Sequence, residues 1–210
     1  MSALWAVVPV KELRHAKARL AGALDPQHRR VLMLAMLEDV LGALARAPAL
    51  DGIIVATLDP DAAAAARRFG AAILREAAGE GHTEAVAAAA RLLAKQGSAM
   101  MTLPADIPLL RPEDVAAVAA CGKDFVIVPS RDGTGTNAVL CAPADLVPLR
   151  FGAPSFVAHL AAARARGIAP HVLDLPRVAL DIDEPADLAA LAAAPEPCRA
   201  REVLALEAQR

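Results

Sequence analysis

The chain has 210 residues, a formal net charge of −2, and 56% hydrophobic but only 2% aromatic residues. This length suits one compact domain, and the charge and the few aromatic residues argue against nucleic acid or an anionic membrane as a partner. No basic region precedes the first apolar run, and no run reaches the roughly 18–20 residues of a membrane span, so we expect neither a signal peptide nor a membrane helix. Three cysteines without CxxC spacing are typical of reduced thiols, which predicts a cytoplasmic protein.

Short apolar runs alternate with longer helical patterns, which is typical of βαβ units and a largely parallel sheet. Strands are expected at residues 4–8, 52–57, 71–74, 99–103, 125–128, 138–141, 171–175 and 178–181. Helix starts are expected at Asp25-Pro26, Asp59-Pro60, Thr83, Pro112, Ser155 and Glu184-Pro185, where each residue or pair is typical of an N-cap or a first turn.

One connection differs from this pattern. Residues 125–128 and 138–141 flank PSRDGTGTN, which predicts a hairpin rather than a crossover. The fold class is therefore α/β, a mostly parallel sheet with an antiparallel hairpin insertion. We expect one domain over residues 1–195 and a peripheral helix over residues 196–210.

The stretch VVPVKELRHAKARL follows the first expected strand. It contains five basic residues, Lys11, Arg14, His15, Lys17 and Arg19. Cations at the carboxyl end of a strand can neutralise a polyphosphate, and a solvated basic segment is the alternative interpretation. The stretch lacks the glycines of a Walker A loop.

Three aspartates are candidate metal ligands. Asp106 lies between two prolines in MMTLPADIPLL, on a rigid corner after a strand, where a turn-forming role is the alternative. Asp181 and Asp183 in VALDIDEPADL would point to the same side of an extended segment and repel each other without a cation between them. The alternative assigns Asp183 to the N-terminus of the next helix, which leaves Asp181 without a partner.

Two glycine-containing segments can bind an anion. In RDGTGTN, glycines allow close backbone approach and Thr136 and Asn137 add polar groups, with a plain hairpin as the alternative. In RFGAPSF, Gly152 and Ser155 precede a helix whose free amides favour a phosphate or carboxylate, with simple capping as the alternative.

PVKELRHAKARL, LPADIPLL, GTGTNAVL, FGAPSF and LDIDEPADL occur here in the order found in the CofC/FbiD guanylyltransferases of coenzyme F420 biosynthesis. The chain resembles this family from about residue 8 to residue 191. The resemblance implies a single-domain, three-layer, GT-A-like nucleotidyltransferase fold. It also implies transfer of GMP from GTP to phosphoenolpyruvate, 2-phospho-L-lactate or 3-phospho-D-glycerate with release of pyrophosphate, and a downstream F420 transferase as a partner.

Residue by residue, the resemblance implies Mg²⁺ ligands at Asp106, Asp181 and Asp183, and catalytic roles for Lys17 and Asp106. It implies nucleotide contacts at Pro9, Lys11, Lys17, Arg19, Gly81, Pro104 and Asp106. It implies contacts to the acid at Thr136, Asn137, Gly152 and Ser155.

One segment departs from the family pattern. Many members have Gly-Leu-Asn where this chain has Gly81-His82-Thr83-Glu84, a segment that lies near the nucleotide in related folds. The sequence therefore leaves two alternatives open. One is a related nucleotidyltransferase with another nucleotide or acceptor, such as the molybdenum-cofactor type, and the other is a non-catalytic nucleotide-binding module.

Overall fold

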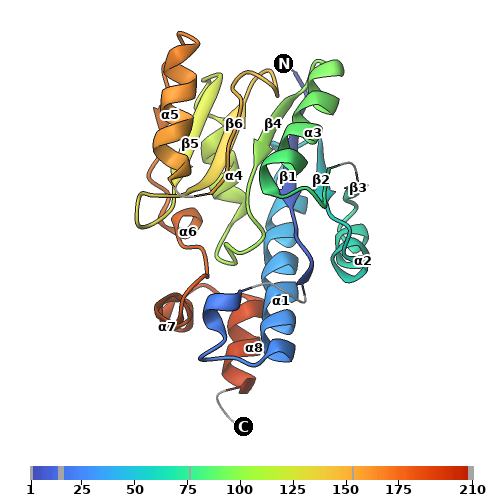
Figure 1. Cartoon of the computed structure of the whole chain (residues 1–210), viewed down its shortest axis with the longest axis vertical. Coiled ribbons are helices and arrows are strands. Elements are labelled where there is room, and N and C mark those ends of the chain that lie inside the picture. The colour runs from blue at the N-terminus through green and yellow to red at the C-terminus, as the bar shows by residue number, and fades with distance from the viewer. Residues whose placement is uncertain (1, 14–16, 76, 153, 208–210) are drawn as a thin grey trace.

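A computed structural model describes residues 2–13, 17–75, 77–152 and 154–207 (Figure 1). Within these residues seven strands form one sheet in the order β3-β2-β1-β4-β6-β5-β7. Of the strands described, β6 alone runs against its neighbours β4 and β5. The strands are β1 Leu4–Pro9, β2 Gly52–Ala56, β3 Ala72–Leu74, β4 Ala99–Thr102, β5 Phe125–Pro129, β6 Thr136–Cys141 and β7 His171–Val172.

Local capping chemistry sets the first helix starts as predicted. The Asp25 carboxylate accepts the His28 amide at 2.9 Å at the start of α1, and Asp59 accepts the Asp61 and Ala62 amides at the start of α2. The helices are α1 Pro26–Ala45, α2 Pro60–Arg68, α3 His82–Lys95, α4 Pro112–Ala119, α5 Ser155–Ala165, α6 Pro176–Ala179, α7 Pro185–Ala193 and α8 Arg199–Glu207, with a 3₁₀ helix η2 at Ala18–Leu20.

Helices cover both faces of the sheet, which confirms the three-layer α/β fold. Side chains alternate along each strand, so Val7 of β1 faces one core and Ala6 and Val8 face the other. Helices α3 and α5 lie on the first face, and α1, α2, α4, α6, α7 and α8 contribute to the core of the second. None of the helices described is long and apolar enough to cross a membrane.

Two expectations about local structure are wrong. Residues 178–181 do not form a strand, because Pro176 favours a first helical turn and begins α6, after which Leu180 returns to an extended backbone. Thr83 and Ser155 are not N-caps, since Gly81 and Pro154 occupy those positions. The Thr83 hydroxyl instead accepts a hydrogen bond from the Phe151 amide, and the Ser155 hydroxyl bonds the Thr136 hydroxyl.

The C-terminal helix α8 lies alongside α1 (Figure 1). The backbone amides of Arg199 and Ala200 each lie 2.8 Å from a carboxylate oxygen of Asp39, which holds the start of α8 against α1. The division of the chain at residue 195 stays a prediction.

Candidate active site

The site lies at the edge of the sheet where the parallel strands end and β6 begins. Here Pro9 closes β1, Pro104 follows β4, and Thr136 and Asn137 open β6. Because β6 runs antiparallel to β4, its first residues reach the same edge as the carboxyl ends of its neighbours. Ligands of open α/β sheets bind at this edge, and two cavities are found there.

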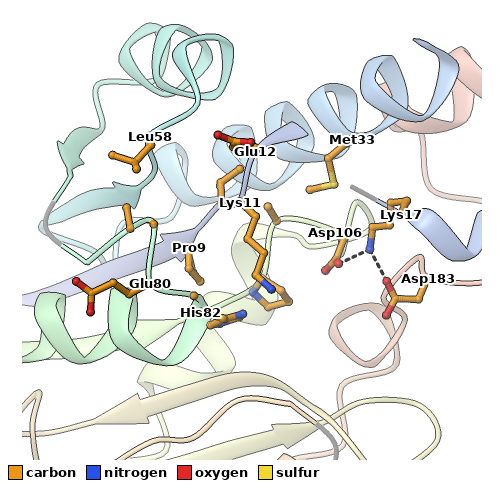
Figure 2. Close-up of a pocket in the computed structure, with 16 residues that line it drawn as sticks. Pro9, Lys11, Glu12, Lys17, Met33, Leu58, Glu80, His82, Asp106 and Asp183 are labelled. Atoms are coloured by element: carbon orange, nitrogen blue, oxygen red, sulfur yellow. Dashed lines mark hydrogen bonds and ion pairs between the residues drawn. The ribbon is translucent and has the colours of Figure 1, made fainter. Parts of the chain in front are cut away.

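The larger cavity has a volume of about 710 Å³ and lies between β1, the start of α3 and the loop after β4. Figure 2 shows Lys11 extending its amine towards His82 across this cavity. The backbone at Gly81 has φ +109°, a conformation that favours glycine at the turn into α3. Six of the seven residues predicted to contact the nucleotide line this cavity: Pro9, Lys11, Lys17, Gly81, Pro104 and Asp106.

The second cavity has a volume of about 420 Å³ and lies against the β5–β6 turn and the start of α5. Its lining includes all four residues predicted to contact the acid: Thr136, Asn137, Gly152 and Ser155. Arg19, predicted on the nucleotide side, lines this cavity instead and lies 3.4 Å from Glu184. Arg14 and His15 lie outside the described residues.

The two cavities share His82, Pro104, Asp106 and Asp183 as lining residues. Lys17 lies at this junction, where its ammonium pairs with Asp106 and lies 2.6 Å from Asp183 Oδ1 (Figure 2). Only 5% of its side chain is exposed. Burial by itself lowers the pKa of Lys17, but the charges of the two aspartates outweigh it and raise the pKa above its ordinary value.

Lys17 also adopts a left-handed backbone conformation, with φ 57° and ψ 44°, immediately before η2. Residues other than glycine enter this region at a cost. The ion pairs of Lys17 with Asp106 and Asp183 offset the cost of its left-handed backbone. The basic loop is therefore more than a solvated segment at this position.

The three predicted metal ligands reach one region without forming a preformed cage. Asp181 and Asp183 both line the second cavity, while Ile182 between them is buried in the core. Burial, followed by the charges of Asp106 and Asp183, raises the pKa of Asp181. Among the residues described, no group of three or more His, Cys, Asp or Glu side chains is arranged to hold a metal ion.

The carboxylates nevertheless suit a cation that binds together with a phosphorylated ligand. Asp106 Oδ1 is buried and has no hydrogen-bond partner within the described part of the chain. Mg²⁺ is usually held by one or two carboxylates with substrate phosphates completing its shell, not by an all-protein cage. The donor set at the junction fits that mode of binding.

Asp183 does not cap α7, because Glu184 is the N-cap residue and Asp187, in the first turn, completes a capping box with it. Asp187 Oδ2 accepts the amides of Asp183 and Glu184 at 3.0 and 2.8 Å, and Oδ1 lies 2.5 Å from the guanidinium of Arg131. Asp187 thus binds the backbone at the start of α7. The Asp183 side chain faces Lys17.

The glycine-containing turn between β5 and β6 is closed by its own carboxylate. Asp132 accepts the Ser130 hydroxyl at 2.5 Å, the Thr134 amide at 2.9 Å and the Thr134 hydroxyl at 2.7 Å. These bonds hold the pKa of Asp132 well below its ordinary range. Because the donors of Ser130 and Thr134 bond Asp132, the turn favours the plain hairpin interpretation over the anion-binding one.

Asn137 lines the second cavity, and the nitrogen of its side-chain amide is engaged within the protein. Its side-chain nitrogen lies 3.0 Å from the carbonyl of Val178, 3.1 Å from that of Ala179 and 3.1 Å from Asp181 Oδ1. An amide group carries two hydrogens, so these three acceptors use its donor capacity. The amide nitrogen of Asn137 holds α6 and Asp181 in place.

Two histidines at the site, the half-buried His82 and the buried His159, were not predicted to have a function. His82 lines both cavities and stacks on Phe151 at 4.1 Å between ring centres, and Phe151 meets His159 edge-on at 5.1 Å. Burial lowers the pKa of each histidine to about 4. The i, i+4 spacing of Ser155 and His159 places them on one face of α5 and was a usable signal for His159.

Comparison of solved structures agrees with this arrangement. The chain superimposes with a TM-score of 0.79 and 19% identity on a protein described as a nucleotide-diphospho-sugar transferase from Desulfovibrio desulfuricans G20, over 100% of this chain and 96% of that one. It superimposes with a TM-score of 0.68 and 15% identity on a nucleotidyl transferase from Methanothermobacter, over 90% and 95%. The fold is that of the nucleotidyltransferases.

Sequence comparison identifies the family. The family described as "Guanylyl transferase CofC like" matches residues 4–206. A phosphoenolpyruvate guanylyltransferase of Rubrobacter xylanophilus is 45% identical over 194 residues, 90% of this chain and 94% of that protein. A 2-phospho-L-lactate guanylyltransferase of Methanothermobacter thermautotrophicus is 36% identical, over 95% of this chain and 88% of that protein. The chain belongs to the CofC-like guanylyl transferase family.

Proposed function

We propose that this protein transfers GMP from GTP to a phosphorylated three-carbon acid and releases pyrophosphate, a step of coenzyme F420 biosynthesis. The observation that carries the proposal is the meeting of two cavities at Lys17, Asp106 and Asp183 in a chain of this family. Phosphoenolpyruvate is the first candidate acid, because the relative at 45% identity is named for it. 2-Phospho-L-lactate and 3-phospho-D-glycerate are the other two.

In the proposed reaction an oxygen of the acid's phosphate attacks the α-phosphorus of GTP. A new phosphorus–oxygen bond forms as the bond to the β-phosphate oxygen breaks, and pyrophosphate leaves. The attacking oxygen is already an anion at neutral pH, so it has no proton for a general base to remove. The protein's task is to hold two anions in line and to stabilise the transition-state charge.

The described side chains divide this task between the cavities. Lys11 supplies positive charge in the larger cavity, which suits the nucleotide. Thr136 and Ser155 supply hydroxyls in the smaller cavity, which suits the acid. Lys17 lies at the junction, and its raised pKa keeps it cationic where the two anions would meet.

We also propose Mg²⁺ as the cofactor, with Asp106, Asp181 and Asp183 as its protein ligands. When bound, Mg²⁺ would neutralise phosphate charge and polarise the phosphorus–oxygen bonds. The unpartnered Asp106 Oδ1 and the raised pKa of Asp181 support this assignment. The Lys17 ammonium forms ion pairs with both Asp106 and Asp183, and so supplies positive charge between them.

The experiment combines GTP, CTP or ATP with each of the three acids, in Mg²⁺ or in EDTA, and measures pyrophosphate release and product mass. We expect pyrophosphate with GTP, one of the acids and Mg²⁺, together with a product carrying both GMP and the acid. Pyrophosphate with CTP in place of GTP would assign a different nucleotide. Nucleotide binding without pyrophosphate from any pair would indicate a binding module and contradict the proposal.

A further inference from the structure

His159 of α5 has a partner for each of its ring nitrogens. The side chain is buried, with 1% exposed. Its Nε2 lies 2.9 Å from the backbone amide of Arg150, and its Nδ1 lies 3.1 Å from Thr136 Oγ1. A backbone N–H only donates, so Nε2 must accept, and in a neutral imidazole the hydrogen is then on Nδ1. The ring is therefore assigned as a donor from Nδ1 to the Thr136 hydroxyl.

The Thr136 hydroxyl consequently receives two hydrogen bonds. The second comes from the Ser155 hydroxyl, whose oxygen lies 3.2 Å away. A hydroxyl has two acceptor positions and one hydrogen, so in this arrangement both acceptor positions of Thr136 are occupied by protein groups. If the Ser155–Thr136 bond ran the other way, the Ser155 hydrogen would be the free one. In either arrangement the pair of hydroxyls keeps one hydrogen for a ligand of the second cavity, which both residues line.

The His159 ring is also fixed in orientation. Phe151 contacts the His159 ring edge-on and stacks on the His82 ring. The backbone amide of Phe151 donates to Thr83 Oγ1 at 2.9 Å. The amide of the preceding residue, Arg150, is the one that His159 accepts. Ring packing and the hydrogen bonds of the Arg150 and Phe151 amides thus hold the segment before α5 against His159, as a preorganised site requires.

We propose that His159 is a positioning residue for the acceptor acid, which forces the Thr136–Ser155 hydroxyl pair to donate a hydrogen to an anionic oxygen of that acid. The inference rests on the proposed function, because it assigns the second cavity to the acid. A hydrogen bond from a neutral donor to an anion is stronger than one between neutral groups. A histidine that only filled space or satisfied the Arg150 amide would not influence the affinity for the acid selectively.

Two substitutions separate these roles. His159→Asn places its amide group near the position of Nδ1 and can still donate to Thr136, whereas His159→Gln places it near Nε2 and retains only the bond from Arg150. We expect His159→Gln to raise the KM for the acid about tenfold and His159→Asn to raise it no more than about threefold, both with nearly unchanged KM for GTP. His171→Gln in β7, which lines neither cavity, is the matched control. Equal effects of Asn and Gln, or equal changes in both KM values, would overturn the proposal.

A double-substitution cycle tests the connection through Thr136. In a Thr136→Val background the hydroxyl is absent, so adding His159→Gln should change the KM for the acid by less than about twofold. A further tenfold rise would show that His159 acts independently of Thr136 and would overturn the proposal.

A measurement on the unaltered protein covers the case in which a variant does not fold. Nitrogen-15 NMR of the histidine rings should show His159 protonated on Nδ1, and the signal should shift when the acid is added. Protonation on Nε2 would overturn the inference. If the unaltered protein released no pyrophosphate with any acid, the proposed function would fail. If it were active and His159→Gln matched it, the inference alone would fail.

Discussion

The Lys17 ammonium lies 2.6 Å from Asp183 Oδ1, although 166 positions separate the two residues in the chain. With Asp106 as a second partner, Lys17 links the loop after β1 to the loops after β4 and α6. Both cavities reach this point. The same ion pairs therefore connect segments of the fold and place a positive charge where the proposed transfer occurs.

Replacing this cation should impair activity more than stability. We expect Lys17→Met to lower kcat/KM by about 10²–10³-fold, because it removes charge stabilisation at the transferring phosphate. The free energy of unfolding should fall by about 1–3 kcal/mol, since Asp106 loses its partner while Asp183, with 46% of its side chain exposed, regains water. Pyrophosphate kinetics and urea unfolding measure the two effects, with exposed Lys123→Met as the control. A variant that kept half of the turnover would remove Lys17 from the catalytic assignment.

Asp181 should show the opposite balance. Burial and the neighbouring carboxylates raise its pKa, so its ionised form costs stability once the pH exceeds the raised value. Asp181→Asn removes that charge, and we expect Tm to rise by about 2–4 °C, the shift that roughly 1 kcal/mol gives in a chain of this size. Activity should fall about 10²-fold or more and need more Mg²⁺. Asp174→Asn on an exposed loop is the control. A lower Tm with an unchanged Mg²⁺ requirement would contradict both parts.

Asn137 should affect turnover rather than the affinity for the acid, because its amide nitrogen is engaged within the protein. Asn137→Ala leaves two carbonyls of α6 without their donor and frees Asp181, so we expect a loss of about 1–3 kcal/mol in unfolding free energy. The value of kcat should fall while the KM for the acid changes less than about twofold. Steady-state kinetics with each substrate varied in turn measure this, and exposed Gln96→Ala is the control. A selective rise in the KM for the acid would contradict this expectation and support the contact with the acid that the sequence predicts.

Features with a local cause were predictable from the sequence. The starts of α1 and α2 follow from Asp-Pro pairs, whose capping bonds lie within three residues. The common orientation of Asp181 and Asp183 was also predicted, although residues 178–179 belong to a helix. The two side chains still point to the same side because the backbone is extended again from Leu180, so side chains alternate over residues 181–183.

Features that depend on distant partners were not predictable. The two ion pairs of Lys17 and its left-handed backbone result from three separate loops meeting at the edge of the sheet. His159 had no metal-ligand spacing, and its function depends on Thr136, which lies 23 positions away on a strand. The bonds from the Asn137 amide to α6 were not predictable either, because nothing local indicated that α6 would lie within its reach.

The half-buried His82 and the buried His159 predict a sensitivity of the fold to acid. Burial lowers the pKa of both His82 and His159 from 6.5 to about 4. Between these values the unfolded chain binds protons that the folded protein does not, so stability must fall as the pH decreases from 6.5 towards 4. Carboxylates contribute to acid unfolding as well, and a comparison with variants isolates the histidines.

We expect the urea midpoint of the unaltered protein to be lower at pH 5 than at pH 7. His159→Asn and His82→Asn cannot titrate, so each should reduce that difference even if it lowers stability at pH 7, and the double variant should reduce it further. Urea titrations at both pH values measure the effect. Parallel decreases in the unaltered protein and in the double variant would mean that the histidines titrate alike in both states, and would contradict their burial as neutral rings.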